Sequence, residues 1–518
     1  MGMRKAGIGD VKTMQGAAQS LLTGIKQKMG ILTTCKHNSV NWVITTERVI
    51  CVDCERSMQR AYKMCLNVAK LLWVLLFLVS GCTKRITNVM CNPQEVFTVV
   101  ASLPSDSLTD AAPGLQTAIN SLPATGGEVR IEDGVHLIAS NWSVNKSNVS
   151  LRGTSMFTCV LKVADSSNLN AVNIANHNRN IELSEFQING NKNTQSSIWC
   201  VGVNANGNDI YGVKTKYLWI RNTKNAGIIF ANGASDGEVY RCRIDSTGPT
   251  GNTSVNTGFG VHIISGCKNI WVQENTFTGT SATACVRVNN GCRVIRILDN
   301  GFYNNDHSGY ADRRAVFVDG PLTRCWDVIV SGSKIKGMDE NGLFLNDIDG
   351  LTADDNDIDS TGYNGIEVNG STDIKLRRND MNRCRGEGMS LNQNKGALLE
   401  QNTNINCGKR GIHVYAAGND STTDIVLNDN HCYSNSDSIL NTWHGIEIGV
   451  SYPAIARRIT ATNNDCVDQG IVKSQKYGMQ ITNDVDYYIL KDNILNPNAT
   501  GGLNDGGYGT HKTVEGNQ

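Results

Sequence analysis

The sequence has few aromatic residues, few prolines, no net charge and few long apolar stretches. Its 48 basic and 48 acidic residues cancel, which argues against a general nucleic-acid binder because such proteins normally carry a basic excess. The 8 prolines stand beside 52 glycines, a balance that favours a regular, turn-rich all-β chain. Aromatic residues make up 6% of the sequence, so any exposed ring is of interest as a platform for a sugar.

An apolar run of 11 residues occupies positions 71–81. It is too short to cross a bilayer, which takes about 20 residues. Basic residues precede it and Cys82 follows it, so residues 58–82 are typical of a signal peptide. The residues VSGC, 79–82, resemble a bacterial lipobox, which implies a lipid on Cys82. We expect an exported protein, either a cell-surface or outer-membrane lipoprotein or an extracellular protein; the alternative is an internal hydrophobic anchor.

Residues 1–57 do not resemble the rest of the chain. A signal that begins near Met58 predicts a translation start at Met58 or Met64, which would make this leader an artefact of gene calling. Two other interpretations are an unstructured leader and a small zinc knuckle. The knuckle's ligands would be Cys35, His37, Cys51 and Cys54. Residues 83–108 are polar and predict a tether.

A repeat of fixed length dominates the remainder of the chain. Glycines recur every 23 residues at Gly342, Gly365, Gly388 and Gly411, each opening a phrase such as GIEVNG. Asparagines recur at the same interval, at Asn356, Asn379 and Asn402. Within each unit apolar residues alternate with a period of two, which indicates short strands. One unit cannot bury its apolar face alone, so successive units must stack.

The pattern spreads outward in looser form and resembles the right-handed parallel β-helix repeat of the pectate-lyase-like superfamily. The opening GLQTAINSLPATGGEVRIEDGVHLI, from Gly114, also resembles that family. The resemblance implies a capping helix at 115–122, then strands at 128–131 and 135–138. We therefore predict an all-β fold, a single right-handed parallel β-helix over 109–500 with an N-terminal capping helix and a tail at 501–518. The resemblance also allows calcium as a cofactor.

The 17 cysteines suggest a disulfide framework, but their positions favour another interpretation. Two positions after the repeated asparagines lies an inward aliphatic slot, which Cys432 and Cys466 fill. Cys384 and Cys407 share another column. Because free cysteine behaves as a small hydrophobe, we expect mostly reduced, buried thiols, the alternative being some disulfides.

Side chains of a strand face alternate sides, so stacked coils align the outward positions of the glycine phrase into two rows. The first row is predicted to hold His262, Arg287, Phe317, Phe344, Glu367, Ser390, His413, Glu447 and Gln480, and the second Ile264, Asn289, Asp319, Asn346, Asn369, Asn392, Tyr415, Gly449 and Thr482. Amides suit sugar hydroxyls because each offers a donor and an acceptor, and phenylalanine rings can stack on sugars. The predicted substrate-binding residues are Arg287, Asn289, Phe317, Phe344, Asn346, Asn369, Asn392, then Arg385, Arg410, Trp443 and His444 from the preceding turns, and His307 and Tyr310 from a long loop.

Two catalytic arrangements are compatible with these rows. A lyase or epimerase acting on an acidic polysaccharide would use His413 and Tyr415, with Glu447 orienting His413 or raising its pKa. Arg385 or Arg410 would hold the substrate carboxylate. A glycoside hydrolase would instead use Asp319 and Glu367, which two coils separate by roughly 9–10 Å, near the spacing of inverting enzymes.

The fold does not decide between these arrangements, because β-helices also serve as non-catalytic adhesins. A glycan-binding surface protein or a phage tail-spike-like protein would carry the same amide and aromatic rows without a proton-transfer pair. In each case the expected partners are a polysaccharide and, through the lipid or apolar segment, a membrane; no nucleic acid is expected.

Overall fold

The computed structural model describes residues 42–44, 49–51 and 96–518, apart from 198, 249–256, 280–282, 304–312, 418–420, 451–453 and 508. The chain divides into two units, Met1–Glu95 and Val96–Gln518. In the first, β1 (Trp42–Ile44) and β2 (Val49–Cys51) pair as an antiparallel hairpin. The side chains of the predicted zinc ligands and the predicted signal with Cys82 lie outside the described part of the chain. Among the described residues, no helix combines the length and the apolar character that crossing a membrane requires.

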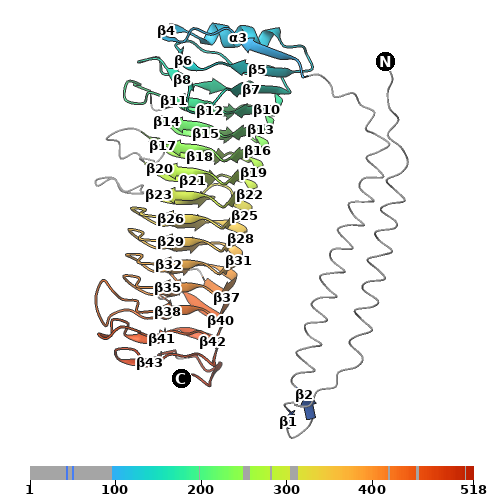
Figure 1. The fold of residues 1–518 in the computed structure, drawn as a ribbon. Helices are drawn as coiled ribbons and strands as arrows, with labels where there is room; N and C mark the ends of the chain where they lie inside the picture. The colour runs from blue at the N-terminus through green and yellow to red at the C-terminus, as the bar shows by residue number, and fades with distance from the viewer. Residues whose placement is uncertain are drawn as a thin grey trace, which may run out of the picture. The chain divides into compact units, whose positions relative to one another are not determined.

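The second unit is a stack of coils built from three parallel sheets, and Figure 1 shows its strands succeeding one another in chain order. Sheet 1 contains β3 (Thr98–Ala101), β5 (Gly127–Ile131), β7 (Val149–Gly153), β10 (Arg179–Ser184), β13 (Tyr211–Lys216), β16 (Ser235–Tyr240), β19 (Lys268–Gln273), β22 (Arg293–Leu298), β25 (Cys325–Ser331), β28 (Ile348–Asp354), β31 (Thr372–Arg377), β34 (Lys395–Glu400), β37 (Ser421–Asn428), β40 (Ile455–Thr462), β42 (Val485–Lys491) and β44 (Lys512–Glu515).

Sheet 2 contains β4 (Asp106–Asp110), β6 (Gly134–Ile138), β8 (Cys159–Val163), β11 (Gln187–Asn189), β14 (Trp219–Arg221), β17 (Arg243–Asp245), β20 (Thr276–Thr278), β23 (Gly301–Tyr303), β26 (Lys334–Lys336), β29 (Asp357–Asp359), β32 (Asp380–Asn382), β35 (Thr403–Ile405) and β38 (His431–Tyr433).

Sheet 3 contains β9 (Val172–Asn173), β12 (Val201–Asn206), β15 (Ala226–Ala231), β18 (Phe259–Ile264), β21 (Ala284–Asn289), β24 (Arg314–Asp319), β27 (Leu343–Asn346), β30 (Ile366–Asn369), β33 (Met389–Asn392), β36 (Ile412–Ala416), β39 (Ile446–Val450), β41 (Tyr477–Ile481) and β43 (Gly501–Asp505).

The helix α3 (Ala112–Ser121) covers one end of the stack, as predicted (Figure 1). Pro113 lies in its first turn, where a missing N–H costs nothing. Its apolar face, which includes Leu115 and Ile119, is fully buried. The predicted strands that follow are β5 and β6.

The interior is one continuous apolar column because most strands turn their alternate residues inward. In the coil of β28, β29 and β30 these residues are Leu351, Ile358, Ile366 and Val368, all fully buried. The repeated glycines pack against this column. A Cβ at Gly365 would lie 2.5 Å from Met381 Cγ, so the turn before sheet 3 approaches sheet 2 too closely for any side chain.

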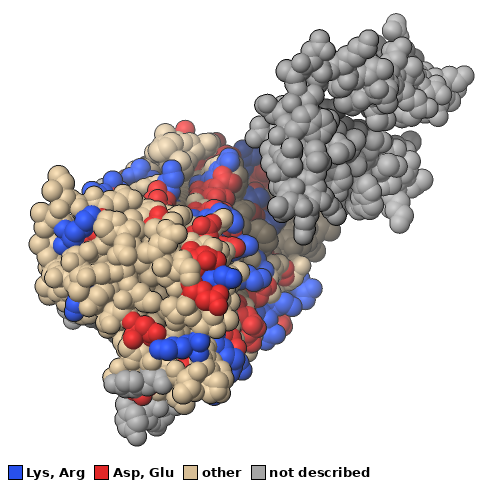
Figure 2. Space-filling model, turned by 90° about the horizontal axis from the view of Figure 1, so that it is seen from below, with Lys and Arg blue, Asp and Glu red and all other residues tan. Residues whose placement is uncertain are grey.

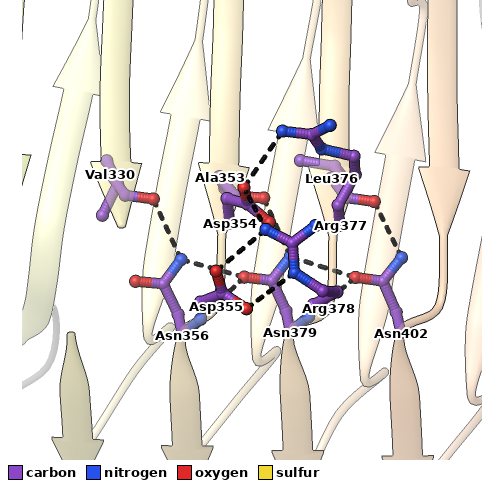
Figure 3. A network of polar contacts seen from close by, with 10 residues as sticks. All are labelled: Val330, Ala353, Asp354, Asp355, Asn356, Leu376, Arg377, Arg378, Asn379 and Asn402. Carbon is purple, nitrogen blue, oxygen red and sulfur yellow. Dashed lines mark hydrogen bonds and ion pairs between the residues drawn. The ribbon is translucent and has the colours of Figure 1, made fainter. Parts of the chain in front are cut away.

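The asparagine ladder holds the turn between sheets 1 and 2 (Figure 3). Asn379 Oδ1 accepts hydrogen bonds from the backbone N–H and the side-chain amide of Asn356, at 3.2 and 2.9 Å. Asn379 Nδ2 donates to Asn402 Oδ1 at 3.0 Å and to the Ala353 carbonyl at 2.9 Å. The same pattern continues through Asn430, Asn464 and Asn493. Each amide is therefore buried with its donors and acceptors satisfied.

Residues with left-handed backbone lie one position before the asparagines, as at Asp355 (φ 55°) and Arg378 (φ 49°). Two expectations about the ends of the β-helix need correction. Part of the predicted tether 83–108 belongs to the β-helix, because β3 pairs with β5 and β4 with β6. The predicted tail 501–518 also continues the stack: β43 pairs with β41 and β44 with β42. These short strands carry too little of the repeat for the spacing to reveal them.

The expectation of reduced thiols is confirmed for the described cysteines, all of which are free and buried: Cys159, Cys200, Cys242, Cys267, Cys285, Cys292, Cys325, Cys384, Cys407, Cys432 and Cys466. Burial raises the pKa of Cys159 and of Cys325 to about 12, so these two thiols are protonated and unreactive at neutral pH.

Replacing Asn379 with alanine should destabilise the β-helix by about 2–4 kcal/mol, because four hydrogen bonds are lost and buried partners remain unpaired. The free energy of unfolding from urea titration would measure this. Lys375→Ala, at an exposed position of the same coil, should change it by less than about 0.5 kcal/mol. Equal effects of the two variants would contradict the role of the ladder.

Candidate functional site

The two predicted outward rows form on sheet 3. Strand register pairs His262 with Arg287, Phe317 with Phe344, Glu367 with Ser390, and His413 with Glu447. The second row pairs Asn289 with Asp319, Asn346 with Asn369, and Asn392 with Tyr415. Side chains far apart in sequence therefore lie on neighbouring strands of one face.

A third row, one residue before the repeated glycine, completes the surface. In the central coils it contains Asn341, Asn364, Glu387, Arg410 and His444. The sequence analysis placed Arg410 and His444 of this row in the turns before the strands, but it did not single out Asn341 and Asn364. Their fixed position in the repeat was the signal that would have identified them.

Arg410 forms hydrogen-bonded ion pairs with two glutamates of this face, Glu387 and Glu447. Its Nε and one terminal nitrogen donate to Glu447 at 2.6 and 3.1 Å, and its other terminal nitrogen donates to Glu387 at 3.0 Å. All three side chains are largely buried, with 8–13% of their surface exposed. Arg410 is thus occupied by the protein's own carboxylates.

His413 lies between the same two glutamates. Its Nδ1 is 3.9 Å from Glu387 and its Nε2 is 3.9 Å from Glu447, both too long for hydrogen bonds. Both glutamates therefore flank the imidazole without a hydrogen bond to it. Burial, then the nearby Arg410 and Lys409, hold the pKa of His413 well below its ordinary value, so the imidazole is neutral at pH 7.

Tyr415 stacks on His413, with ring centroids 4.5 Å apart and planes inclined by 14°. Burial raises the pKa of Tyr415, and Glu367, Glu387 and Tyr363 raise it further. The phenol therefore stays protonated at neutral pH and is a proton donor. The structure brings the predicted pair of His413 and Tyr415 together beside Glu447.

Glu367 accepts three amide hydrogen bonds on this face. Asn341 and Asn364 both donate to its Oε2, at 3.0 and 2.9 Å, and Asn369 donates to its Oε1 at 3.0 Å. Asp319 lies two strands away in the second row and accepts a hydrogen bond from Asn346 at 2.9 Å. The predicted pair of carboxylates therefore shares one face, with Glu367 already hydrogen-bonded to the protein's own amides.

The aromatic part of the face is covered by arginine. Arg287 lies over Phe317 at 4.8 Å, and Arg314 lies over Phe317 and Phe344 at 4.8 and 4.7 Å. The two phenylalanine rings also meet edge to face at 5.2 Å. The predicted sugar platforms are therefore partly occupied by guanidinium groups.

The remaining predicted residues come from the turns before these strands and from a loop. Trp443 stacks under Arg410 at 4.2 Å, and His444 Nε2 is 3.5 Å from Glu447. Arg385 is exposed and lines a shallow hollow with Arg383 in the turn before β33. His307 and Tyr310 lie outside the described residues. Within the described ranges, no group of three or more histidine, cysteine, aspartate or glutamate side chains is arranged to hold a metal ion.

The charged surface away from this face is mixed. Figure 2 shows basic and acidic side chains alternating in a band. On sheet 1 ion pairs between neighbouring coils include Arg152–Glu185, Arg241–Glu274, Arg296–Asp327, Arg378–Asp355 and Arg458–Asp424. Exposed pairs of this kind contribute about 0–1 kcal/mol each, so they set the character of the surface more than the stability of the fold.

Comparison with known proteins agrees with this architecture. Residues 321–518 match the family model described as the right handed beta helix region. Together with the three parallel sheets, this match makes the second unit a right-handed parallel β-helix, as predicted. No curated protein matches the chain in sequence.

Several solved structures resemble the chain at low identity. The mannuronan C-5 epimerase AlgE6 A-module of Azotobacter vinelandii is 14% identical, with 80% of this chain and 97% of that one covered and a TM-score of 0.48. The catalytic unit of a GH87 α-1,3-glucanase from Streptomyces thermodiastaticus is 14% identical, with 82% and 69% covered and a TM-score of 0.45. The Dettilon tailspike protein is 12% identical, with 81% and 68% covered and a TM-score of 0.39.

His444 should make stability depend on pH. Burial, then Arg410 and Lys476, lower its pKa to about 3, whereas the unfolded value is about 6.5. Between these values the unfolded chain binds the extra proton, so stability should fall as pH falls from 6.5 to 3, by up to about 1.4 kcal/mol per pH unit. Urea unfolding of wild type and His444→Gln would measure this. The same pH slope in both proteins would show that His444 does not contribute.

Proposed function

We propose that the protein acts on an acidic polysaccharide, as a lyase or epimerase, along the outward face of sheet 3. The observation that carries the proposal is the stacked pair of His413 and Tyr415, a neutral imidazole beside a protonated phenol.

We also propose that the protein is exported, with residues 58–82 as the signal peptide and Cys82 as the lipidated residue.

The chemistry requires removal of a proton from the carbon next to a uronate carboxyl group. His413 would take that proton. In a lyase, the electron pair of the broken C–H bond forms a double bond, the glycosidic C–O bond breaks, and its oxygen takes a proton from Tyr415. In an epimerase, the same carbon would take a proton back from water on its opposite face, because Tyr415 stacks on His413 and lies on the same side as the base. General acid–base catalysis of this kind contributes about 10²–10⁴-fold in rate.

The substrate carboxylate needs a cation, and Lys409 fits that role better than Arg410. Lys409 is close enough to His413 to lower the pKa of the imidazole, and its ammonium group lies 5.5 Å from the ring centre of Tyr363. It is partly exposed. A uronate bound there would place its acidic carbon near the base.

A hydrolase is less well supported. An inverting mechanism needs both carboxylates available to the substrate and to water, whereas Glu367 already accepts three hydrogen bonds from the protein's own amides. A non-catalytic glycan-binding protein is the second candidate, because the paired charges of Arg410, Glu387 and Glu447 also make a rigid binding surface.

Tyr415→Phe and His413→Gln should each lower turnover of an acidic polysaccharide by about 10²-fold or more. Alginate and polygalacturonate would be assayed for absorbance of unsaturated uronates and, by NMR, for change in epimer ratio. A matched control exists on sheet 2, where His431 and Tyr433 have the same spacing and Tyr433 Oη lies 2.9 Å from His431 Nδ1. His431→Gln and Tyr433→Phe should leave turnover within about twofold.

If wild type binds these polymers with neither product signal, and the His413 and Tyr415 variants bind as well as wild type, the protein is a glycan binder. Release of reducing ends without unsaturated product, lost in Asp319→Asn, would instead identify a hydrolase.

Lys409→Ala should raise KM for the acidic polymer by about tenfold, while kcat changes less, because the lost contact serves binding of the carboxylate. The effect should shrink at 0.5 M salt, where exposed charges are screened. Arg385→Ala, in the hollow of the turn, provides the comparison and should have a smaller effect. A larger loss in Arg385→Ala would restore the sequence-based assignment.

A further inference from the structure

A second hollow lies on sheet 1, away from the face described above. It has a volume of about 350 Å³, within the usual range for small-molecule sites. It spans β13, β16 and β19, with Asn180 of β10 at one side. No step of the proposed function uses it.

The hollow arises from the local backbone. A left-handed residue recurs near the start of each strand of sheet 1 here, at Asn180, Gly212, Asp236 and Asn269 (φ 54–68°). Gly212 has no side chain, and an added Cβ there would lie 3.0 Å from Asn180 Oδ1. The backbone is therefore bare at Gly212, where a side chain would otherwise fill the surface.

Two exposed aromatic rings border this bare area. Tyr211 and Trp271 expose 45% and 39% of their surface, which stands out in a chain with so few aromatics. Trp271 is fixed in place, since its Nε1–H donates to Asn269 Oδ1 at 2.9 Å. The amide of Asn269 in turn donates to Asp236 Oδ1 at 2.5 Å. The ring is thus positioned by a chain of hydrogen bonds before any ligand arrives.

The polar groups around the rings suit hydroxyl donors. Gln273 donates to Glu238 Oε1 at 2.8 Å, and Asn269 uses one oxygen of Asp236. A carboxylate has about four acceptor sites, so both retain capacity for further hydrogen bonds. Lys214 supplies a donor on the same strand as Tyr211. One lysine against two carboxylates leaves a net charge of −1 in the hollow, which disfavours acidic sugars.

We propose that this hollow binds a neutral sugar residue of a glycan. The apolar face of a pyranose ring stacks on Trp271 or Tyr211, and its hydroxyls donate to Asp236 and Glu238. The two faces of the β-helix then recognise different chemistry: acidic sugars at sheet 3 and neutral sugars at sheet 1. This assignment stands independently of the proposed catalysis.

Affinity gel electrophoresis of the whole protein tests the proposal with dextran, laminarin, galactomannan and arabinoxylan as neutral probes. At least one should retard wild type. Trp271→Ala and Tyr211→Ala should weaken that retardation by about tenfold or more, equivalent to about 1.4 kcal/mol, whereas Trp271→Phe should retain most of it. His413→Gln should bind the neutral probe as wild type does.

Trp326→Ala is the matched control, because Trp326 also lies on the outer side of sheet 1 but outside the hollow. It should bind like wild type. Thermal unfolding of each variant separates lost binding from lost fold. The proposal is overturned if none of the four neutral polysaccharides retards wild type, if folded Trp271→Ala binds unchanged, or if Trp326→Ala weakens binding equally.

Discussion

The parallel stacking of coils in strict register is the constraint on which everything else depends. The asparagine ladder enforces it, because each amide bonds to the amide of the next coil and to a carbonyl of the preceding one. A slip of one residue would leave these buried groups unpaired and would turn the apolar column outward. The glycine column adds a steric limit on the opposite turn. Rows of aligned side chains follow from these two restraints.

A rigid face of this kind can hold ionisable groups in states that they would not adopt in water. Arg410 draws Glu387 and Glu447 to itself, so neither carboxylate bonds to the imidazole between them. Burial, then the charges of Arg410 and Lys409, lower the pKa of His413 and keep it neutral, with Tyr415 stacked on it. The same register that stabilises the fold thus sets the proton affinities of the proposed site.

Sequence reasoning predicted the β-helix, the capping helix, the buried thiols and both outward rows, because each follows from a fixed period that projects directly onto space. It failed where the period was weak. The strands β3, β4, β43 and β44 were taken for tether and tail. Asn404 occupies the inward slot between Met381 and Cys432, where the repeat leads us to expect an aliphatic residue. The ion pairs of Arg410 with Glu387 and Glu447 were not predicted. The repeat shows which residues lie on neighbouring strands, but it does not show in which direction a long side chain points.

The amino-acid sequence alone therefore determined which residues share a face, because a 23-residue period and two-residue alternation leave one arrangement that buries the apolar column. Only the tertiary structure decided how those residues interact. Arginine, glutamate and asparagine side chains each reach several neighbours, and the choice among them depends on packing and desolvation across coils. That choice placed three amides on Glu367, two glutamates on Arg410, and a neutral imidazole beside Tyr415.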